Sequence, residues 1–291
     1  MVAQLAGVLA PVVLTVLIGL LWGKWQRKID TDALNFAVIN IGTPCLIIAS
    51  LVQVDVDTKV LSQVAFAALI VAFATGLLAT IVCKLTGSPM RAYVPGVVFS
   101  NNANMGLPLC LYAFGEVGLS IGVAYYVTIA TLHFTFGLMW FSGKLSFKPM
   151  LKNPIFWAAM FAILMKASNT GLPGWLGNWL QFVGNLANPL MLILLGISLA
   201  RIQLTTLKRP LGFAMLRVFG GMTVAYGVCQ MLGLSGVVAG VVLIQASTAS
   251  AVVNYLLAEQ YQSQPKEMAA MVMLSTAVAF ASMPFLIATL I

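Results

Sequence analysis

Apolar runs of about the length that crosses a lipid bilayer recur along the whole 291-residue chain. A transmembrane helix needs roughly 20 consecutive, mostly apolar residues. Charged residues make up only 8% of the sequence, whereas soluble domains average about 25%. A soluble fold of this size would not cover its surface with so few charges. The sequence therefore predicts an all-α integral membrane protein that crosses the bilayer many times.

We expect ten transmembrane helices, with ends placed to within about 2–4 residues. The sixth is the shortest and ends in a stretch rich in glycine and proline, residues 171–174. No connecting segment is long enough for a soluble domain, so residues 1–291 are predicted to form a single transmembrane unit. The expected spans are 5–23, 33–51, 60–83, 91–114, 118–142, 154–169, 178–200, 210–232, 236–258 and 268–290.

Lysine and arginine residues gather on one side of these spans. The positive-inside rule places their loops in the cytoplasm, so both chain termini are expected on the non-cytoplasmic side. Arg217 falls within the eighth span, where we expect its side chain to snorkel toward the cytoplasmic surface. Only Lys59 and Lys166 lie on the opposite side. The cytoplasmic set is Lys24, Arg27, Lys28, Lys84, Arg91, Lys144, Lys148, Lys152, Arg201, Lys208, Arg209 and Lys266.

The net charge of +8 comes from these scattered loop residues. They form no basic stripe, so nucleic acid is not an expected partner, whereas the lipid bilayer is. The four cysteines lie in apolar runs and include no CxxC pair. We therefore expect reduced thiols in the protein core and no metal site.

The two halves of the chain carry matching patterns. Asn40 and Pro44 in the second span recur as Asn185 and Pro189 in the seventh, 145 residues later. Residues 95–104 in the fourth span also match residues 239–248 in the ninth. Five spans per half is an odd number, so the second half must be inverted relative to the first. We therefore predict inverted repeats over 5–142 and 154–290, an architecture found in many secondary transporters.

The middle of the fourth span combines Asn101, Asn102, Asn104, Gly106 and Pro108. A proline removes a backbone donor and clashes with the preceding turn. Broken backbone at membrane depth is tolerated only where it is buried in protein or lines a cavity. Broken helix ends also offer N–H groups and a positive dipole end to an anion. We predict a substrate-binding site here. The alternative is that the asparagines only hold helices together.

The ninth span supplies a second polar centre. Gln245, Ser247, Thr248 and Ser250 provide amide and hydroxyl groups there. Together with the fourth span, they are predicted to form a substrate site near the bilayer midplane. Small hydroxyl residues also mediate ordinary helix packing, which is the competing interpretation.

Pro44 and Pro189 are predicted to kink the second and seventh spans. Polar residues beside them either line the cavity, where Thr43 is expected to contact substrate, or bond to the carbonyl groups that proline frees. These residues are Asn40, Thr43, Asn185 and Asn188.

His133 is the only histidine and lies inside the fifth span. An ionisable group within the membrane is by default a functional candidate, and the pKa range of histidine suits a proton carrier. It is equally able to donate a hydrogen bond between helices without titrating. Tyr126, nearby on the same span, is expected to face the same cavity.

The acidic residues are all placed in loops or at span ends: Asp30, Asp32, Asp55, Asp57, Glu116, Glu259 and Glu267. The usual carboxylate proton relay is thus missing from the predicted membrane core. Sodium can still bind backbone carbonyls and amide or hydroxyl oxygens at helix breaks. We therefore expect no cofactor; transport is either coupled to a proton or sodium or is not coupled to an ion. A pocket without a carboxylate also favours an organic anion as the substrate.

The run Asn-Asn-Ala-Asn-Met-Gly-Leu-Pro-Leu over 101–109 resembles the broken fourth helix of the auxin efflux carrier family, within the bile acid/sodium symporter-like superfamily. The resemblance extends to residues 40–44, 195–199, 253–261 and 274–284, and so covers nearly the whole chain. It implies ten helices, with broken helices 4 and 9 crossing. It also implies a scaffold and a transport domain that move as an elevator, and a homodimer.

Members of this size are similar to bacterial malonate and malate permeases of the inner membrane, whereas plant members export indole-3-acetate. In that family the substrate lies at the crossing, which implies roles for Asn101, Asn102, Asn104 and Pro108. The chain departs from the family at the ninth helix, where a proline is common but residues 247–250 read Ser-Thr-Ala-Ser. Nothing in the local sequence therefore forces a break there.

Three classes of function are compared. An embedded enzyme needs a base, nucleophile or metal set in its pocket, and one histidine without a carboxylate in the predicted membrane core provides none. The sequence contains no P-loop motif, so ATP-driven transport is not expected. The sequence favours a secondary active carrier of small organic anions. A channel or facilitative pore for a small neutral or anionic solute is the alternative.

Overall fold

The computed structural model describes residues 2–25, 30–168, 170–201 and 208–290. Within these residues, regular structure is helical apart from one isolated β-bridge, which confirms the all-α prediction. Arg27 and Lys28 of the predicted cytoplasmic set lie outside the described residues. The first half contains α1 (Val2–Lys24), α2 (Thr31–Ala37), η1 (Val38–Gly42), α3 (Thr43–Gln53), α4 (Thr58–Thr86), α5 (Met90–Val98), η2 (Asn102–Gly106), α6 (Leu107–Leu132), η3 (His133–Gly137) and α7 (Leu138–Ser142).

The second half follows a short connecting helix, α8 (Lys148–Lys152). Its elements are α9 (Pro154–Ala167), α10 (Gly174–Gly184), α11 (Ala187–Arg201), α12 (Lys208–Met215), η4 (Leu216–Gly220), α13 (Gly221–Leu232), α14 (Gly236–Ala246), α15 (Val252–Gln260) and α16 (Pro265–Leu290).

Four short segments labelled η are π-helical turns, which commonly mark irregular or functional positions in helices.

Seven continuous helical segments within the described residues are long and apolar enough to cross a membrane, so the protein is a multi-pass membrane protein. One of them, Asn102–Ser142, bends sharply at Gly115, whose φ of 65° is left-handed and suits glycine. The bend falls between the predicted fourth and fifth spans. Two shorter apolar helices are α9 and α14.

Helices occupy most of each predicted range, but in three ranges residues outside any helix separate two helices. The range 91–114 contains α5 and the start of α6, 178–200 contains parts of α10 and α11, and 236–258 contains α14 and α15. The seventh range begins earlier than expected, because α10 starts at Gly174. Each interruption removes a stretch of regular backbone hydrogen bonding that other groups must replace.

The irregular positions in the second and seventh ranges precede proline. The π-turn η1 ends immediately before Thr43 and Pro44, and Pro44 lies in the first turn of α3. In the seventh range, α10 ends at Gly184 and Pro189 follows in the first turn of α11. A proline is tolerated in a first turn because that N–H has no intrahelical acceptor.

Close packing of α1 along α11 depends on two glycines. A Cβ added to Gly19 would lie 2.8 Å from the carbonyl carbon of Ile193, and one added to Gly196 would lie 2.6 Å from the Leu20 nitrogen. Small residues let membrane helices approach this closely. The neighbouring helix α3 packs against α9 and α10.

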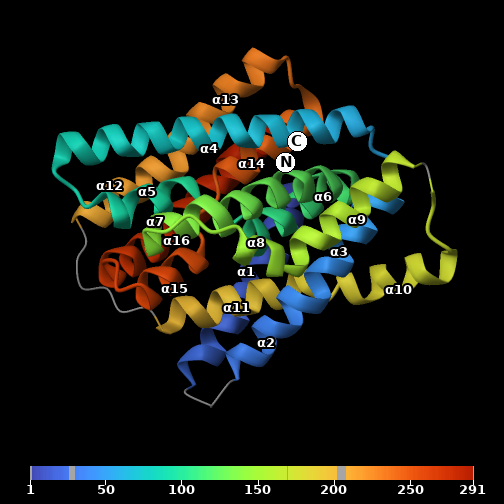
Figure 1. Ribbon diagram of the computed structural model, residues 1–291, viewed down its shortest axis with the longest axis horizontal. Coiled ribbons are helices and arrows are strands. Elements are labelled where there is room, and N and C mark those ends of the chain that lie inside the picture. The colour runs from blue at the N-terminus through green and yellow to red at the C-terminus, as the bar shows by residue number, and fades with distance from the viewer. Residues whose placement is uncertain (1, 26–29, 169, 202–207, 291) are drawn as a thin grey trace.

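The remaining helices pack into a second set, in which α4 contacts α5, α6 and α13, while α16 contacts α12 and α15. In Figure 1, α4 runs across the upper part of the molecule with α13 above it, and α2 lies near the bottom. The interrupted helices α5, α6 and α14 lie between α4 and α2 in this view (Figure 1). The candidate site is built where they meet.

Candidate site at the crossing of two broken helices

The breaks in the fourth and ninth ranges pair with each other. Ser100 and Ser250 form an isolated antiparallel bridge. The backbone N–H of Asn101 donates to the carbonyl of Ala249 (2.8 Å), and that of Ala251 donates to the carbonyl of Phe99 (3.0 Å). Each break therefore satisfies backbone groups that the other exposes, as burial in the membrane requires.

The ninth range is broken although residues 247–250 contain no proline. Helix α14 ends at Ala246 and α15 begins at Val252. The N–H of Ser250 donates to the Ser275 hydroxyl on α16 (3.0 Å), and the Asn254 amide donates to the Phe99 carbonyl (2.9 Å). Tertiary partners hold this break open.

Arg217 corrects one expectation from the sequence. Its side chain does not snorkel to the surface: it is 1% exposed and is among the largest fully buried side chains described. Its guanidinium donates to the carbonyls of Val97 and Ala246, and to that of Val98 at 3.3 Å. These carbonyls end α5 and α14, so one cation contacts the negative ends of both half-helices.

After each break the chain continues as a second half-helix, η2 with α6 in the fourth range and α15 in the ninth. Both of these half-helices begin at a cavity of about 120 Å³. Its lining includes residues 100–104 at the start of η2 and residues 251–253 at the start of α15. The first turn of a helix has N–H groups without intrahelical acceptors and carries a partial positive charge. Other polar lining residues are Asn35, Thr43, Tyr126 and His133. No carboxylate side chain is among the lining residues, so this environment favours an anion.

Among the described residues, two buried side-chain nitrogens in the cavity lining have no hydrogen-bond partner: Asn101 Nδ2 and His133 Nε2. Asn101 is 4% exposed and His133 is 6% exposed. The imidazole of His133 stacks on Phe99 with ring centroids 4.3 Å apart, and the Asn254 side chain lies next to it. Because an unpaired buried donor costs free energy, these two groups are the strongest candidates for contacts with a bound molecule.

Comparison with known proteins identifies the type of molecule. A family model described as membrane transport protein matches residues 138–287, about half of the chain. The chain belongs to the auxin efflux carrier family of membrane transport proteins. It is also 26% identical over 270 residues to an uncharacterized transporter from Methanothermobacter thermautotrophicus, an alignment that covers 88% of this chain and 87% of the relative. These likenesses point to a transport role rather than an enzymatic one.

Five predicted residues of this transporter line the crossing cavity: Asn101, Asn102, Asn104, Thr43 and Tyr126. His133, the predicted proton or substrate contact, lines it as well. These residues come from η1–α3, η2, α6 and η3, which lie far apart in the sequence. The structure therefore brings together the polar centre of the fourth range, one residue beside Pro44 and two residues of the fifth range.

The predicted polar residues of the ninth range lie elsewhere. Gln245, Ser247, Thr248 and Ser250 are fully buried and do not appear in the lining of this cavity. Thr248 donates to the Gln245 carbonyl at 3.0 Å. The ninth range instead reaches the cavity through the backbone and apolar side chains that follow the break. The Ser247 hydroxyl is buried without a partner.

Asn102 and Gln245 lie on the two broken helices and join them by hydrogen bonds, a contact called the brace below. The Asn102 amide donates to the Gln245 carbonyl (3.0 Å) and to its side-chain Oε1 (2.8 Å). Gly106 allows this contact, because an added Cβ would lie 2.7 Å from Gln245 Cδ. Pro108 is buried in the first turn of α6 and is likewise outside the cavity lining. Gly106 and Pro108 thus shape the break rather than touch the cavity.

The asparagines beside the other prolines also lie outside this cavity. Asn40 is exposed and donates to the Phe36 carbonyl one turn earlier (3.0 Å). Asn185 lines a separate cavity of about 170 Å³ with Glu116 and Gln53. Asn188 is buried, and its Oδ1 has no partner. For Asn40, bonding within its own helix is the arrangement observed.

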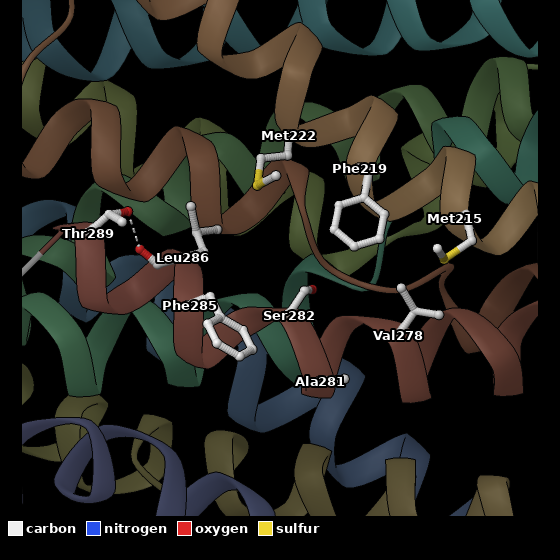
Figure 2. A pocket seen from close by; sticks show the side chains of 9 residues that line it. All are labelled: Met215, Phe219, Met222, Val278, Ala281, Ser282, Phe285, Leu286 and Thr289. Carbon is white, nitrogen blue, oxygen red and sulfur yellow. Dashed lines mark hydrogen bonds between the residues drawn. The ribbon is translucent and has the colours of Figure 1, made fainter. Parts of the chain in front are cut away.

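A larger cavity of about 630 Å³ lies between α16 and the α12–η4–α13 segment. Figure 2 shows its apolar lining, which includes Met215, Phe219 and Phe285, all of them exposed at the surface. Its two hydroxyl residues, Ser282 and Thr289, donate to carbonyls of α16 itself. Because its described lining is apolar and open to the molecular surface, it offers no polar arrangement suited to an anion.

Sequence reasoning missed two contributors to the crossing. Arg217 was expected to reach the surface, and Ser275 was not singled out at all. A cation inside a transmembrane range usually faces the protein interior and pairs with other groups, often backbone carbonyls. That rule is a usable signal for Arg217, whereas Ser275 is marked only by lying in the segment 274–284 of the resemblance, which does not indicate its partner.

Proposed function

We propose that this transporter is a secondary active carrier that moves a small organic anion, such as a mono- or dicarboxylate, through the cavity at the helix crossing. The observation that carries the proposal is the convergence of two helix N-termini and the unpaired Asn101 amide on a cavity lined by no carboxylate. Fixed N–H dipoles stabilise a negative charge without supplying a counter-charge that would trap it.

The cavity size favours a compact anion. A volume of about 120 Å³ is below the roughly 300–1,000 Å³ of typical small-molecule pockets. This comparison favours a three- or four-carbon dicarboxylate over the larger indole-3-acetate. We therefore expect malonate and malate to be better substrates than indole-3-acetate.

For the architecture, we propose ten spans in two inverted repeats, 5–142 and 154–290, with helices 4 and 9 crossing. Helix contacts support this arrangement. In an inverted repeat, span one (α1) corresponds to span six (α9), and span two (α3) corresponds to span seven (α11). The observed contact between α1 and α11 therefore has a counterpart in the contact between α9 and α3. The pairs α4–α5 and α13–α14 correspond in the same way.

An elevator motion is part of the proposal. The helices α1, α3, α9, α10 and α11 would form the scaffold, and the remaining spans would form the transport domain. The cavity draws its lining from both sets, with Met191 and Ile155 on the scaffold side and Asn101 and His133 on the transport side. A substrate at such a boundary moves across the membrane when one set slides against the other.

The test is uptake of labelled malonate, malate and indole-3-acetate into proteoliposomes with imposed proton or sodium gradients. A carrier shows saturable uptake and counterflow, and its coupling ion is the one whose gradient drives accumulation. If the proton couples through His133, His133→Gln abolishes the response to pH gradients while counterflow persists. Failure to take up any of the three acids would remove the organic-anion assignment.

A channel or facilitative pore for a small neutral or anionic solute is the second candidate. It predicts flux that rises linearly with concentration and shows no counterflow. The unpaired polar atoms that gather at a single cavity favour the carrier, because a pore needs weak, successive sites rather than one site.

Placement and assembly are separate proposals. We expect an inner-membrane protein of a bacterium with both termini outside the cytoplasm, since Lys144, Lys148 and Lys152 lie on the opposite side. Reporter fusions at each terminus test the orientation. The expected homodimer is tested by the mass of the detergent-solubilised protein.

A further inference from the structure

We propose that the Arg217 guanidinium occupies the position of a coupling cation at the helix crossing, so that transport needs no sodium ion there. Removing this side chain would leave the carbonyls of Val97, Val98 and Ala246 free to coordinate sodium. The proposal rests on the proposed carrier function only for its uptake measurement.

The first observation is the identity of the groups that Arg217 contacts. The carbonyls of Val97, Val98 and Ala246 come from the last turns of two separate half-helices. Carbonyls at a helix C-terminus lack intrahelical donors and carry a partial negative charge. Half-helix C-termini and unwound carbonyls of this kind coordinate sodium in transporters built from broken helices.

The second observation is that no carboxylate neutralises the cation. Within the described residues, no Asp or Glu side chain forms an ion pair with Arg217, whose titratable neighbour is the Tyr125 phenol. One guanidinium nitrogen, Nε, has no partner. A buried charge without a counter-ion is costly, so the two helix ends must provide most of its stabilisation.

The third observation is that the backbone around Gly221 leaves space for the Arg217 side chain. Gly221 lies one turn after Arg217, and a Cβ added there would lie 2.5 Å from Arg217 Nη2 and would overlap the Ala246 carbonyl oxygen. The π-turn η4 carries Arg217, and such turns often occur at functional positions. The backbone is thus shaped to bring a guanidinium to both helix ends.

The arrangement separates charge across the crossing. Arg217 compensates the negative ends of α5 and α14, while the positive ends of η2 and α15 remain open to the cavity. A carrier with a mobile sodium ion at these carbonyls would acquire this polarity only when the ion binds. Here the polarity is permanent, so the cavity favours an anion at any sodium concentration.

The test compares the wild type with Arg217→Ala and Arg217→Lys, in sodium chloride and in choline chloride at equal ionic strength. A ligand that binds only the folded state raises the thermal unfolding midpoint in a concentration-dependent manner. We expect no sodium-specific shift for the wild type or Arg217→Lys, and a saturable sodium-specific rise for Arg217→Ala. This measurement needs no substrate.

Uptake in proteoliposomes provides the second measurement. Wild-type uptake should be equal in sodium and choline. Arg217→Ala should lose roughly tenfold or more in choline, the scale expected when one partner of a buried charge interaction is removed, and should recover in part with sodium. Should Arg217→Ala fail to fold, Arg217→Gln takes its place.

Several results would overturn the proposal. Wild-type uptake or unfolding that requires sodium would do so, as would a folded Arg217→Ala variant with the same midpoint in both salts. An absence of uptake by the wild type for every tested acid, with the sodium-specific shift of Arg217→Ala intact, would instead locate the failure in the proposed substrate.

Discussion

The Asn102 side-chain amide donates to both the backbone and the side-chain oxygens of Gln245, at 3.0 and 2.8 Å. Both residues are buried, and each belongs to one of the two broken helices. A single asparagine therefore ties the start of η2 to the end of α14. Gln245 in turn donates to the Gly122 carbonyl at 3.3 Å, which extends the brace to α6.

Asn102→Ala should destabilise the fold by about 1–3 kcal/mol, because it leaves the buried side-chain Oε1 of Gln245 without a donor, while the Gln245 carbonyl keeps only its bond from Thr248. The measurement is the thermal unfolding midpoint in detergent. Asn40→Ala is the matched control: Asn40 is exposed, and its amide bonds only within its own helix. We expect the control to stay within about 0.5 kcal/mol of the wild type. Equal midpoints for the two variants would contradict the brace.

Asn101→Ala and Asn104→Ala should show the opposite pattern. Both residues line the cavity, and Asn101 Nδ2 has no internal partner to lose. Folding should be nearly unchanged, while a lost hydrogen bond to a charged substrate costs about 1.5–3 kcal/mol, or roughly 10- to 100-fold in KM. Uptake kinetics with the unfolding midpoint provide the check. Normal transport by Asn104→Ala would show that the site is elsewhere.

The positions of the helices along the chain are largely predictable from apolar runs and from proline. Pro108 and its neighbouring asparagines indicated the break in the fourth range, and Pro44 and Pro189 marked the irregular turns. The break between α14 and α15 was not predictable locally, because no residue there forbids a helix. It depends on Ser275 and on pairing with the fourth range, contacts that form only in the folded protein.

The candidate site was predictable in part. The polar residues of the fourth range reach the cavity, but Ser247, Thr248 and Ser250 do not. Composition indicates that a helix centre is polar, whereas its rotation about the axis is set by packing against neighbours. The direction taken by Arg217 was undetermined for the same reason: its carbonyl partners lie on other helices, up to 120 residues away.

Gly106→Ala should weaken the brace between Asn102 and Gln245 through a steric clash. The added Cβ would lie 2.7 Å from Gln245 Cδ, and overpacking of this kind costs about 1–3 kcal/mol. Gly227→Ala is the control, since nothing lies within 4 Å of a Cβ there. The control should be neutral or slightly stabilising, because alanine is favoured over glycine in helices. A lower unfolding midpoint for Gly106→Ala alone is expected, and a fall in both variants would contradict the explanation.

The final prediction concerns the contact between α1 and α11. Gly19→Ala and Gly196→Ala should each destabilise the protein by about 1–3 kcal/mol. An added Cβ at Gly19 would lie 2.8 Å from the Ile193 carbonyl carbon, and one at Gly196 would lie 2.9 Å from the carbonyl carbon of Gly19 itself. Gly7→Ala, also on α1 but with nothing within 4 Å, is the control and should have little effect.

The double variant distinguishes a shared contact from two independent defects. Once either alanine has pushed the helices apart, the second meets a wider gap and should cost less than it does alone. Residues in contact typically show coupling of about 0.5–3 kcal/mol, whereas distant sites add to within roughly 0.5 kcal/mol. We therefore expect the loss in the double variant to be smaller than the sum of the single losses. Simple additivity of the unfolding free energies would show that the two glycines do not act at one interface.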